Sequence, residues 1–298
     1  CENKIFRLVG SSAADFQLSP IASDIGCVEG DTVQEVAGDV VFLAQDGLRT
    51  ISGTEKVGDF NLLSISKVIQ DRVEDFVQTH TEFSSITIGS KTQYRIFGFS
   101  NSVTTESAKG FIGTQILGQG GVQFNWAETS GIQAKVAHSS LRQGVELIVF
   151  GHTNGLIYKM ESGNTFAAGS SNNTIQAVYR SPDMVMGDPG LRKYMQRVNL
   201  NYEGEGTSID ANLALRYNYD DQNSPQPEKI ALPSVGGAGQ YGAASYGSSL
   251  YDASGVPLVR QTVEGSGFAV ALQIDDQNSA DSFSVKGFQL EFTPGGRR

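Results

Sequence analysis

The sequence predicts an all-β protein: a partial β-propeller of about three blades with one inserted amphipathic helix, followed by a small antiparallel β-sandwich. The composition favours this class, because 35 of the 298 residues are Gly and only 18% are charged, as in turn-rich β proteins. A strand–turn–strand pattern also recurs along the first half of the chain. The last third alternates apolar and polar residues with the period of a half-buried strand.

The chain begins with Cys1 in place of an initiator Met. Either residues upstream of Cys1 are missing from the sequence, or Cys1 is the lipidated cysteine of a mature lipoprotein. A lipoprotein usually continues into a flexible polar tether. Here the stretch KIFRLV, a predicted strand, follows within three residues, so a missing upstream part is favoured.

The first predicted hairpin lies at residues 40–53, VVFLAQDGLRTISG, with Asp46 and Gly47 as turn residues. A similar pattern surrounds Asn101 in YRIFGFSNSVTTES, and a third copy, LIVFGHTNGLIYKM, contains Asn154 and Gly155. Asp-Gly and Asn-Gly supply the positive φ angles of two-residue hairpin turns.

The three copies are evenly spaced. Asp46 and Asn101 are 55 residues apart, and Asn101 and Asn154 are 53 residues apart. This is the period of a propeller blade. Three blades cannot close a ring, so we expect missing upstream residues or a partner chain to complete the propeller.

Residues 61–78, NLLSISKVIQDRVEDFVQ, break the β pattern. Apolar residues recur at spacings of three and four, and charged residues occupy the other face, which predicts an amphipathic helix of about four turns. The helix either packs on its own domain, which is favoured, or meets a neighbouring subunit.

Two domains are predicted, residues 1–185 with the blades and residues 186–298 with the sandwich. The boundary is placed in SPDMVMGDPG, where two prolines and two glycines cluster. Residues 196–204, 208–221, 267–276 and 283–294 are the predicted strands of the sandwich. Between them, a Gly/Ser-rich loop carries Tyr241, Tyr246 and Tyr251, which either anchor a subunit interface or fold back over the sandwich.

No catalytic or metal-binding signature is present, so we predict no enzyme, no cofactor and no metal. The three histidines, His80, His138 and His152, share no metal-ligand spacing, and no phosphate-loop or nucleophile motif occurs. The oxygen-rich stretches at 219–224 and 275–282 lack the glycine and the terminal Glu of a calcium loop, which favours solvated loops.

Charge and hydropathy exclude further classes of function. The net charge of -10 repels nucleic acid, and no apolar run approaches the roughly 18 residues of a membrane helix. Cys1 and Cys27 are the only cysteines, so no disulfide framework is expected.

Several stretches resemble the propeller-type tail nozzle, or DNA-stabilisation, proteins of short-tailed bacteriophages. The match covers Ile25, Gly26 and Cys27 followed by the strand from Val40 to Gly47, the passage GLIYKMESGNTF with AVYRSPDMVMGDPGLRKYMQRVNL, and the ending FSVKGFQLEFTPGGRR. These are patterns of turns and strands that touch most of the chain. Such proteins are usually longer at the N-terminus.

The resemblance implies a structural protein of the virion tail. It implies a subunit of a homo-oligomeric ring, commonly six-fold, that contacts the portal, the adaptor and other tail proteins. Genomic DNA would pass through the ring without sequence-specific binding, and a lining poor in Lys and Arg would let it slide.

Two alternatives remain open. The first is a carbohydrate-binding tail adhesin, which would need an acid pair or an aromatic platform. Trp126 is the only tryptophan available for such a platform, which weakens this alternative. The second is a propeller-type envelope lipoprotein anchored through Cys1.

Overall fold

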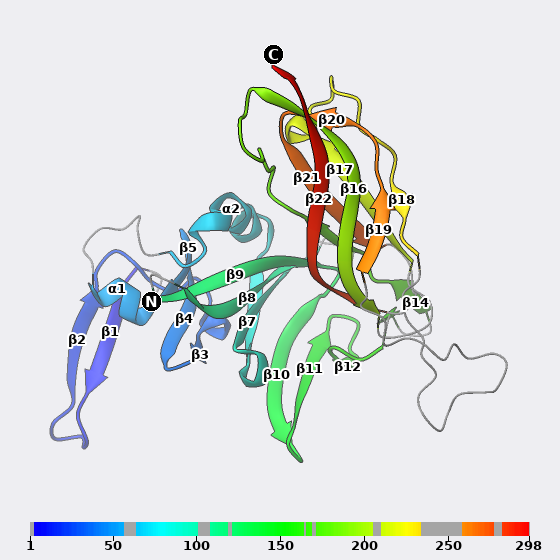
Figure 1. The fold of residues 1–298 in the computed structure, drawn as a ribbon. Helices are drawn as coiled ribbons and strands as arrows, with labels where there is room; N and C mark the ends of the chain where they lie inside the picture. Colours follow the sequence, from blue (N-terminus) through cyan, green and yellow to red (C-terminus); the bar gives the residue numbers. More distant parts are fainter. Residues whose placement is uncertain are drawn as a thin grey trace. The chain divides into compact units, whose positions relative to one another are not determined.

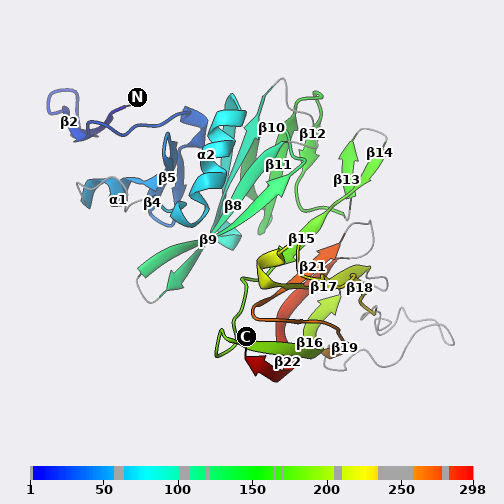
Figure 2. The same ribbon diagram turned by 90° about the horizontal axis from the view of Figure 1, so that it is seen from above.

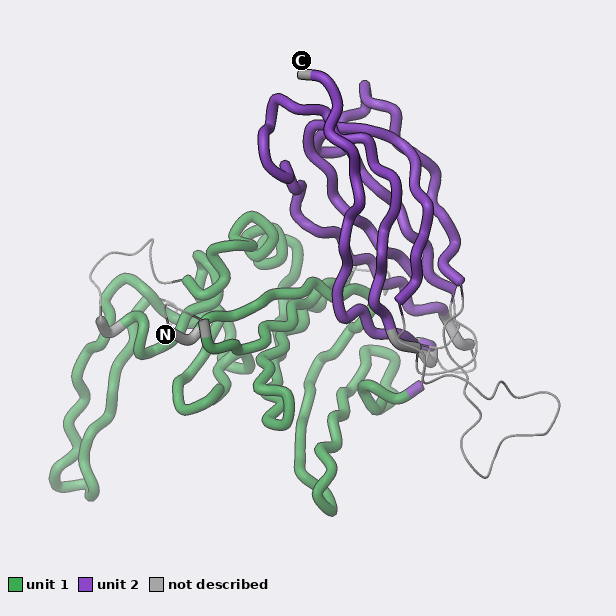
Figure 3. The backbone as a smooth tube through the Cα atoms, in the orientation of Figure 1, with its two compact units in different colours: residues 1–162 green, residues 163–298 purple. Residues whose placement is uncertain are grey.

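A computed structural model of the chain describes residues 3–56, 64–100, 108–118, 121–163, 165–168, 171–204, 210–233, 258–276 and 282–297. Strands account for 58% and helices for 11%, which confirms the all-β class. The chain forms two compact units, residues 1–162 and 163–298 (Figure 3). Asn101 and the three loop tyrosines, Tyr241, Tyr246 and Tyr251, lie outside the described residues.

The border between the units comes earlier in the chain than the predicted boundary at 185. Strand β15 (Ala177–Arg180) pairs with β21 (Val270–Asp276), deep in the second unit. The Ser181 and Met184 amides continue this attachment, donating to the carbonyls of Leu272 and Val270 at 2.8 Å each. The cluster of prolines and glycines at 181–190 is therefore a feature inside the second unit.

The first unit contains a hairpin and three antiparallel sheets, each made of strands that are consecutive in the chain (Figure 1). The hairpin is β1 (Ile5–Val9) with β2 (Gln17–Ala22). The sheets are β3 (Gln34–Val36), β4 (Asp39–Ala44) and β5 (Gly47–Thr50); β6 (Glu82–Ile88), β7 (Gln93–Phe99), β8 (Lys109–Gly118) and β9 (Gly121–Ser130); and β10 (Ala134–Arg142), β11 (Val145–His152) and β12 (Ile157–Lys159).

The three sheets pack face to face in chain order, with the β6–β9 sheet in the middle. Its two faces alternate along each strand and belong to different cores. One face packs on the β3–β5 sheet in a cluster of Val36, Val41, Leu43, Leu48, Phe83, Tyr94, Ile96 and Phe111. The other packs on the β10–β12 sheet in a cluster of Ile86, Ile88, Phe97, Ala134, Ile148 and Met160. Because both faces are covered, β7 is buried along almost its whole length, Arg95 included.

The predicted helix is present but begins later than residue 61. A 3-10 turn (Lys67–Ile69) leads into α2 (Gln70–Thr79), and residues 61–63 lie outside the described part. Just before the turn, the Ile65 amide donates to the Leu48 carbonyl at 2.9 Å, so the chain here still follows β5. Val73 and Phe76 are buried in the core that joins the β3–β5 and β6–β9 sheets. The helix thus packs on its own unit, as does the shorter α1 (Ile51–Lys56) beside β4.

The second unit is the predicted antiparallel sandwich. One sheet has the order β15-β21-β17-β18, with β17 (Ala211–Tyr217) and β18 (Ile230–Ala231). The other is built on the long β16 (Leu191–Gly204), which pairs with β19 (Leu258–Thr262), β20 (Ser266–Gly267) and β22 (Phe283–Arg297). Leu200, Tyr202, Leu213, Leu215 and Leu272 are buried between the two sheets. A separate hairpin joins β13 (Thr165–Ala168) to β14 (Ser171–Thr174) (Figure 2).

Candidate interaction surfaces

The hairpin around Asp46 and Gly47 exists, but its turn is shifted by one residue from the prediction. Ala44 pairs with Gly47, so the two turn residues are Gln45 and Asp46. Gly47 has the expected positive φ, +129°, and a Cβ there would come within 2.7 Å of two serine hydroxyls. Sequence reasoning missed a second role of Asp46: its carboxylate accepts hydrogen bonds from the fully buried guanidinium of Arg49, with Arg49 Nε 2.9 Å from Oδ1.

Asn154 and Gly155 also lie in a turn, but not in a two-residue one. β11 ends at His152 and β12 begins at Ile157, so four residues connect the two strands. Asn154 Oδ1 accepts from the Leu156 amide at 3.0 Å, and Gly155 has a φ of +82° with open space around it. This turn and the Asp46 turn belong to different sheets, separated by the β6–β9 sheet, so they do not form one site.

Within the described part of the first unit, no layer covers one face of the β10–β12 sheet, called here the outer face. The strand register places on it Val136, His138, Ser140, Arg142, Val145, Leu147, Val149, Gly151, Ile157 and Lys159. Val145 is 70% and Ile157 78% exposed, although both are strongly apolar. The charged residues among these positions are Arg142 and Lys159, and none is acidic. In a chain of net charge -10, this is an apolar face with a basic character.

The β1–β2 hairpin also exposes apolar side chains on one face, called here the hairpin face. Phe6 pairs with Pro20 and Leu8 with Leu18, which places all four on the same side, and Phe16 continues the alternation of β2. Leu8 is 61% and Leu18 65% exposed. A two-stranded hairpin of this kind is marginally stable by itself in water, so its apolar face is suited to docking on another surface.

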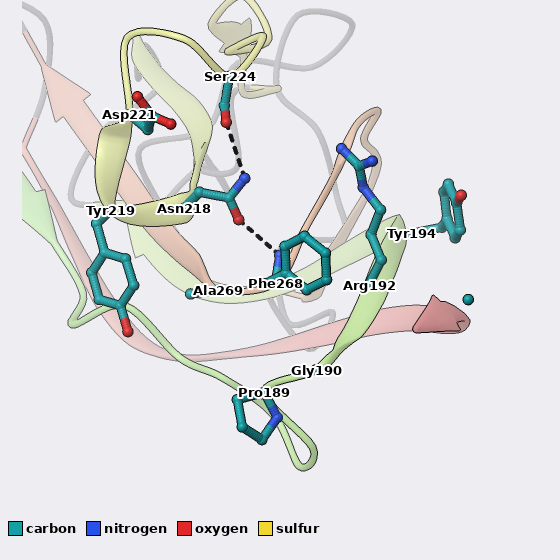
Figure 4. Close-up of a pocket in the computed structure, with 11 residues that line it drawn as sticks. Pro189, Gly190, Arg192, Tyr194, Asn218, Tyr219, Asp221, Ser224, Phe268 and Ala269 are labelled. Carbon is teal, nitrogen blue, oxygen red and sulfur yellow. Dashed lines mark hydrogen bonds between the residues drawn. The ribbon is translucent and has the colours of Figure 1, made fainter. Parts of the chain in front are cut away.

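The second unit has a cavity of about 740 Å³ at one end of the sandwich (Figure 4). Asn218 and Tyr219 line one wall. Together with Asp220 they have positive φ angles of 54°, 62° and 60°, a left-handed run that is strained for residues other than glycine. Asn218 is fixed by its own hydrogen bonds: its Oδ1 accepts from the Phe268 amide at 2.8 Å, and its Nδ2 donates to Ser224 Oγ at 3.1 Å.

Arg192 stands across this cavity from Tyr219 in Figure 4. Its guanidinium lies 5.8 Å from the centre of the Phe268 ring, and its buried Nε has no hydrogen-bond partner among the described residues. Exposed Tyr194 and Tyr219 and the carboxylate of Asp221 also line the space. Aromatic rings beside hydrogen-bonding groups could hold a polar ligand with flat apolar faces.

Titratable groups form no further site in the described part of the chain. No three His, Cys, Asp or Glu side chains there are placed to hold a metal ion. Burial lowers the pKa of His80, which packs on α2 with its Nδ1 2.9 Å from the Phe76 carbonyl. Asp221 Oδ1 accepts from the amide and side chain of Asn223 at 3.0 Å, within the loop predicted to be solvated. The described helices include none long and apolar enough to cross a membrane.

No protein-family model and no curated protein matches the chain.

Proposed function

We propose that the chain is a structural subunit of a ring, specifically of a tail nozzle in the virion of a short-tailed bacteriophage. The observation that carries the proposal is the uncovered outer face at the end of three sheets packed face to face. Neighbouring propeller blades pack in this way, and a sheet with an apolar face needs another layer to cover it. An assembly of several chains supplies that layer.

The charge of the chain fits the passage of DNA through such a ring. Only 22 residues are Lys or Arg, against 32 Asp or Glu. Each cation placed against a phosphate adds salt-dependent affinity, so a lining with few cations holds DNA weakly and lets it move. In this proposal the ring is six-fold and stacks on the portal and adaptor, as the resemblance to nozzle proteins implies.

Mass photometry and negative-stain imaging of the purified chain test the proposal. We expect closed rings of six subunits, and the same rings on the tail axis of a virion that contains the chain. A chain that stays monomeric at micromolar concentration and is absent from virions would refute it.

The cavity of the second unit favours one other function, carbohydrate binding by a tail adhesin. Two exposed tyrosines, Tyr194 and Tyr219, could stack on sugar rings, while Arg192 and Asp221 offer a donor and an acceptor for hydroxyl groups. A glycan array probed with the purified chain distinguishes the two functions. Selective glycan binding that Tyr219→Ala abolishes would favour the adhesin, and no selective binding would exclude it.

A further inference from the structure

We propose that the hairpin face of one copy of the chain docks on the outer face of the β10–β12 sheet of a second copy. This inference rests on the proposed ring, and it names the two surfaces that would form each contact. Both surfaces are exposed in a single copy, and both are rich in large apolar side chains.

The two faces lie at opposite ends of the first unit. The hairpin is next to α1, which packs on the β3–β5 sheet, while the β10–β12 sheet lies on the far side of the central β6–β9 sheet. Figures 1 and 2 show this separation from two directions. Within one copy, the hairpin face therefore cannot cover the outer face.

The surface areas are adequate for a specific contact. Five side chains of the hairpin face, each about half exposed, present roughly 500 Å² of apolar surface, and the outer face presents a similar area. A stable interface covers roughly 800 Å² on each partner, so these patches would form the core and their polar borders the rim.

Charge adds a polar contact at the border of the two surfaces. The outer face carries Arg142 and Lys159 without an acidic residue, so a carboxylate of the second copy fits beside it. The hairpin contributes Asp15 at its connection. Backbone and side-chain hydrogen bonds from Ser11 and Ser12 lower the pKa of Asp15 to about 2, so this carboxylate stays ionised.

The geometry of such a contact does not stop at a dimer. The two surfaces differ, so docking uses one surface of each copy and leaves its other surface free for the next copy. The series closes into a ring when the rotation between neighbouring copies brings the last hairpin to the first outer face, which is the case that the proposed ring requires.

Three variants of the full chain, measured by mass photometry, test the docking. Leu18→Asp places a charge on the hairpin face and Ile157→Asp places one on the outer face, both at exposed positions. Val178→Asp is the matched control, because Val178 is a comparably exposed valine on β15 in the second unit. Trp126 fluorescence checks that the two variants of the first unit fold, and circular dichroism checks the fold of Val178→Asp in the second unit.

We expect each of the first two variants to raise the concentration needed for half-assembly by about a hundredfold, and the control to leave it unchanged. An equimolar mixture of Leu18→Asp and Ile157→Asp keeps one intact pair of surfaces. It should therefore form dimers and nothing larger.

Other outcomes separate this inference from the proposed function. Rings that persist in both variants would overturn the docking and leave the ring intact. A wild-type chain that never assembles would overturn both. If Ile157→Asp changes the unfolding of the monomer, another part of the same chain covers the outer face, and the docking is wrong.

Discussion

Gly47 offers the sharpest test of the first unit, because its backbone and its surroundings both exclude a side chain. Its φ of +129° lies in a region that L-residues rarely adopt. A Cβ at this position would stand 2.7 Å from both Ser64 Oγ and Ser66 Oγ and 3.1 Å from Gln70 Oε1. Ser66 cannot easily move away, because its hydroxyl accepts from the buried Leu48 amide at 3.0 Å.

The strained backbone and the close contacts together determine how much Gly47→Ala should lower the free energy of unfolding. Strained φ costs about 1–3 kcal/mol, and overpacking a filled site costs about 1–3 kcal/mol more, so unfolding should become easier by about 4 kcal/mol. Gly155→Ala meets only the backbone cost, since nothing lies within 4 Å of its Cβ position, and should lose about 1–2 kcal/mol. Gly30→Ala is the control, with neither a positive φ nor a neighbour within 4 Å.

Trp126 makes the assay specific to the first unit. It is the only tryptophan, its ring stacks on Phe124, and its Nε1 donates to the Ile65 carbonyl at 2.9 Å, next to the serines that would clash. Urea unfolding followed by its emission reports the free energy of that unit. Equal losses in Gly47→Ala and Gly155→Ala would refute the packing around the β4–β5 turn.

Three further predictions concern charge, pH and the second unit. Asp46→Asn weakens the hydrogen bonds to buried Arg49 and should lower the free energy of unfolding by about 2 kcal/mol in the same assay. Asp46→Glu should recover part of this loss. An unchanged free energy in Asp46→Asn would mean that the pair does not stabilise the unit. The pKa of His80 is lowered in the folded state, so the unfolded state binds more protons and the free energy of unfolding should fall as the pH drops below about 6.5. Urea curves at pH 7.5 and 5.5 should show a smaller fall in this free energy for His80→Gln than for the wild type. An equal fall in both proteins would contradict this. Residues 163–298, produced alone, should melt cooperatively when followed by circular dichroism. Residues 190–298 lack β15 and should be less stable by about 2–4 kcal/mol, because β21 loses its hydrogen bonds to that strand. Equal melting midpoints would show that β15 is dispensable.

Local patterns predicted much of the fold because they act over a few residues. The hairpin at 40–53 was found from an apolar run interrupted by Asp-Gly, and the sandwich strands ending at Asp276 and Arg297 from their alternation. The helix around Val73 and Phe76 was found from its spacing of three and four. Its start was misplaced because Ile65 is held by a hydrogen bond to Leu48, a contact that no local pattern reveals.

The features that the sequence alone places wrongly, or does not reveal, depend on contacts between segments that are distant in the chain. The β4–β5 turn is one residue off because Asp46 is engaged by Arg49 and Gly47 is enclosed by Ser64 and Ser66. The cavity of the second unit draws Arg192, Tyr219 and Phe268 from three separate segments, so no sequence motif marks it. Alternation shows which side chains share a face, but not whether another layer covers that face.

The stacking of the sheets explains why the end layers, and not the centre, are suited to assembly. The β6–β9 sheet has a neighbour on each face, and polar contacts reinforce both sides: the Tyr94 hydroxyl donates to the Thr32 carbonyl at 2.8 Å, and Ser84 Oγ donates to the Ala134 carbonyl at 2.7 Å. Among the described residues of the first unit, the β10–β12 sheet has such support on one face only. In a stack of layers, stability is close to a sum of contacts between neighbours, so an end layer gains most from a further neighbour. A copy that docks on the outer face would stabilise the sheet it covers, and assembly and folding of the first unit would therefore be coupled through the β10–β12 sheet.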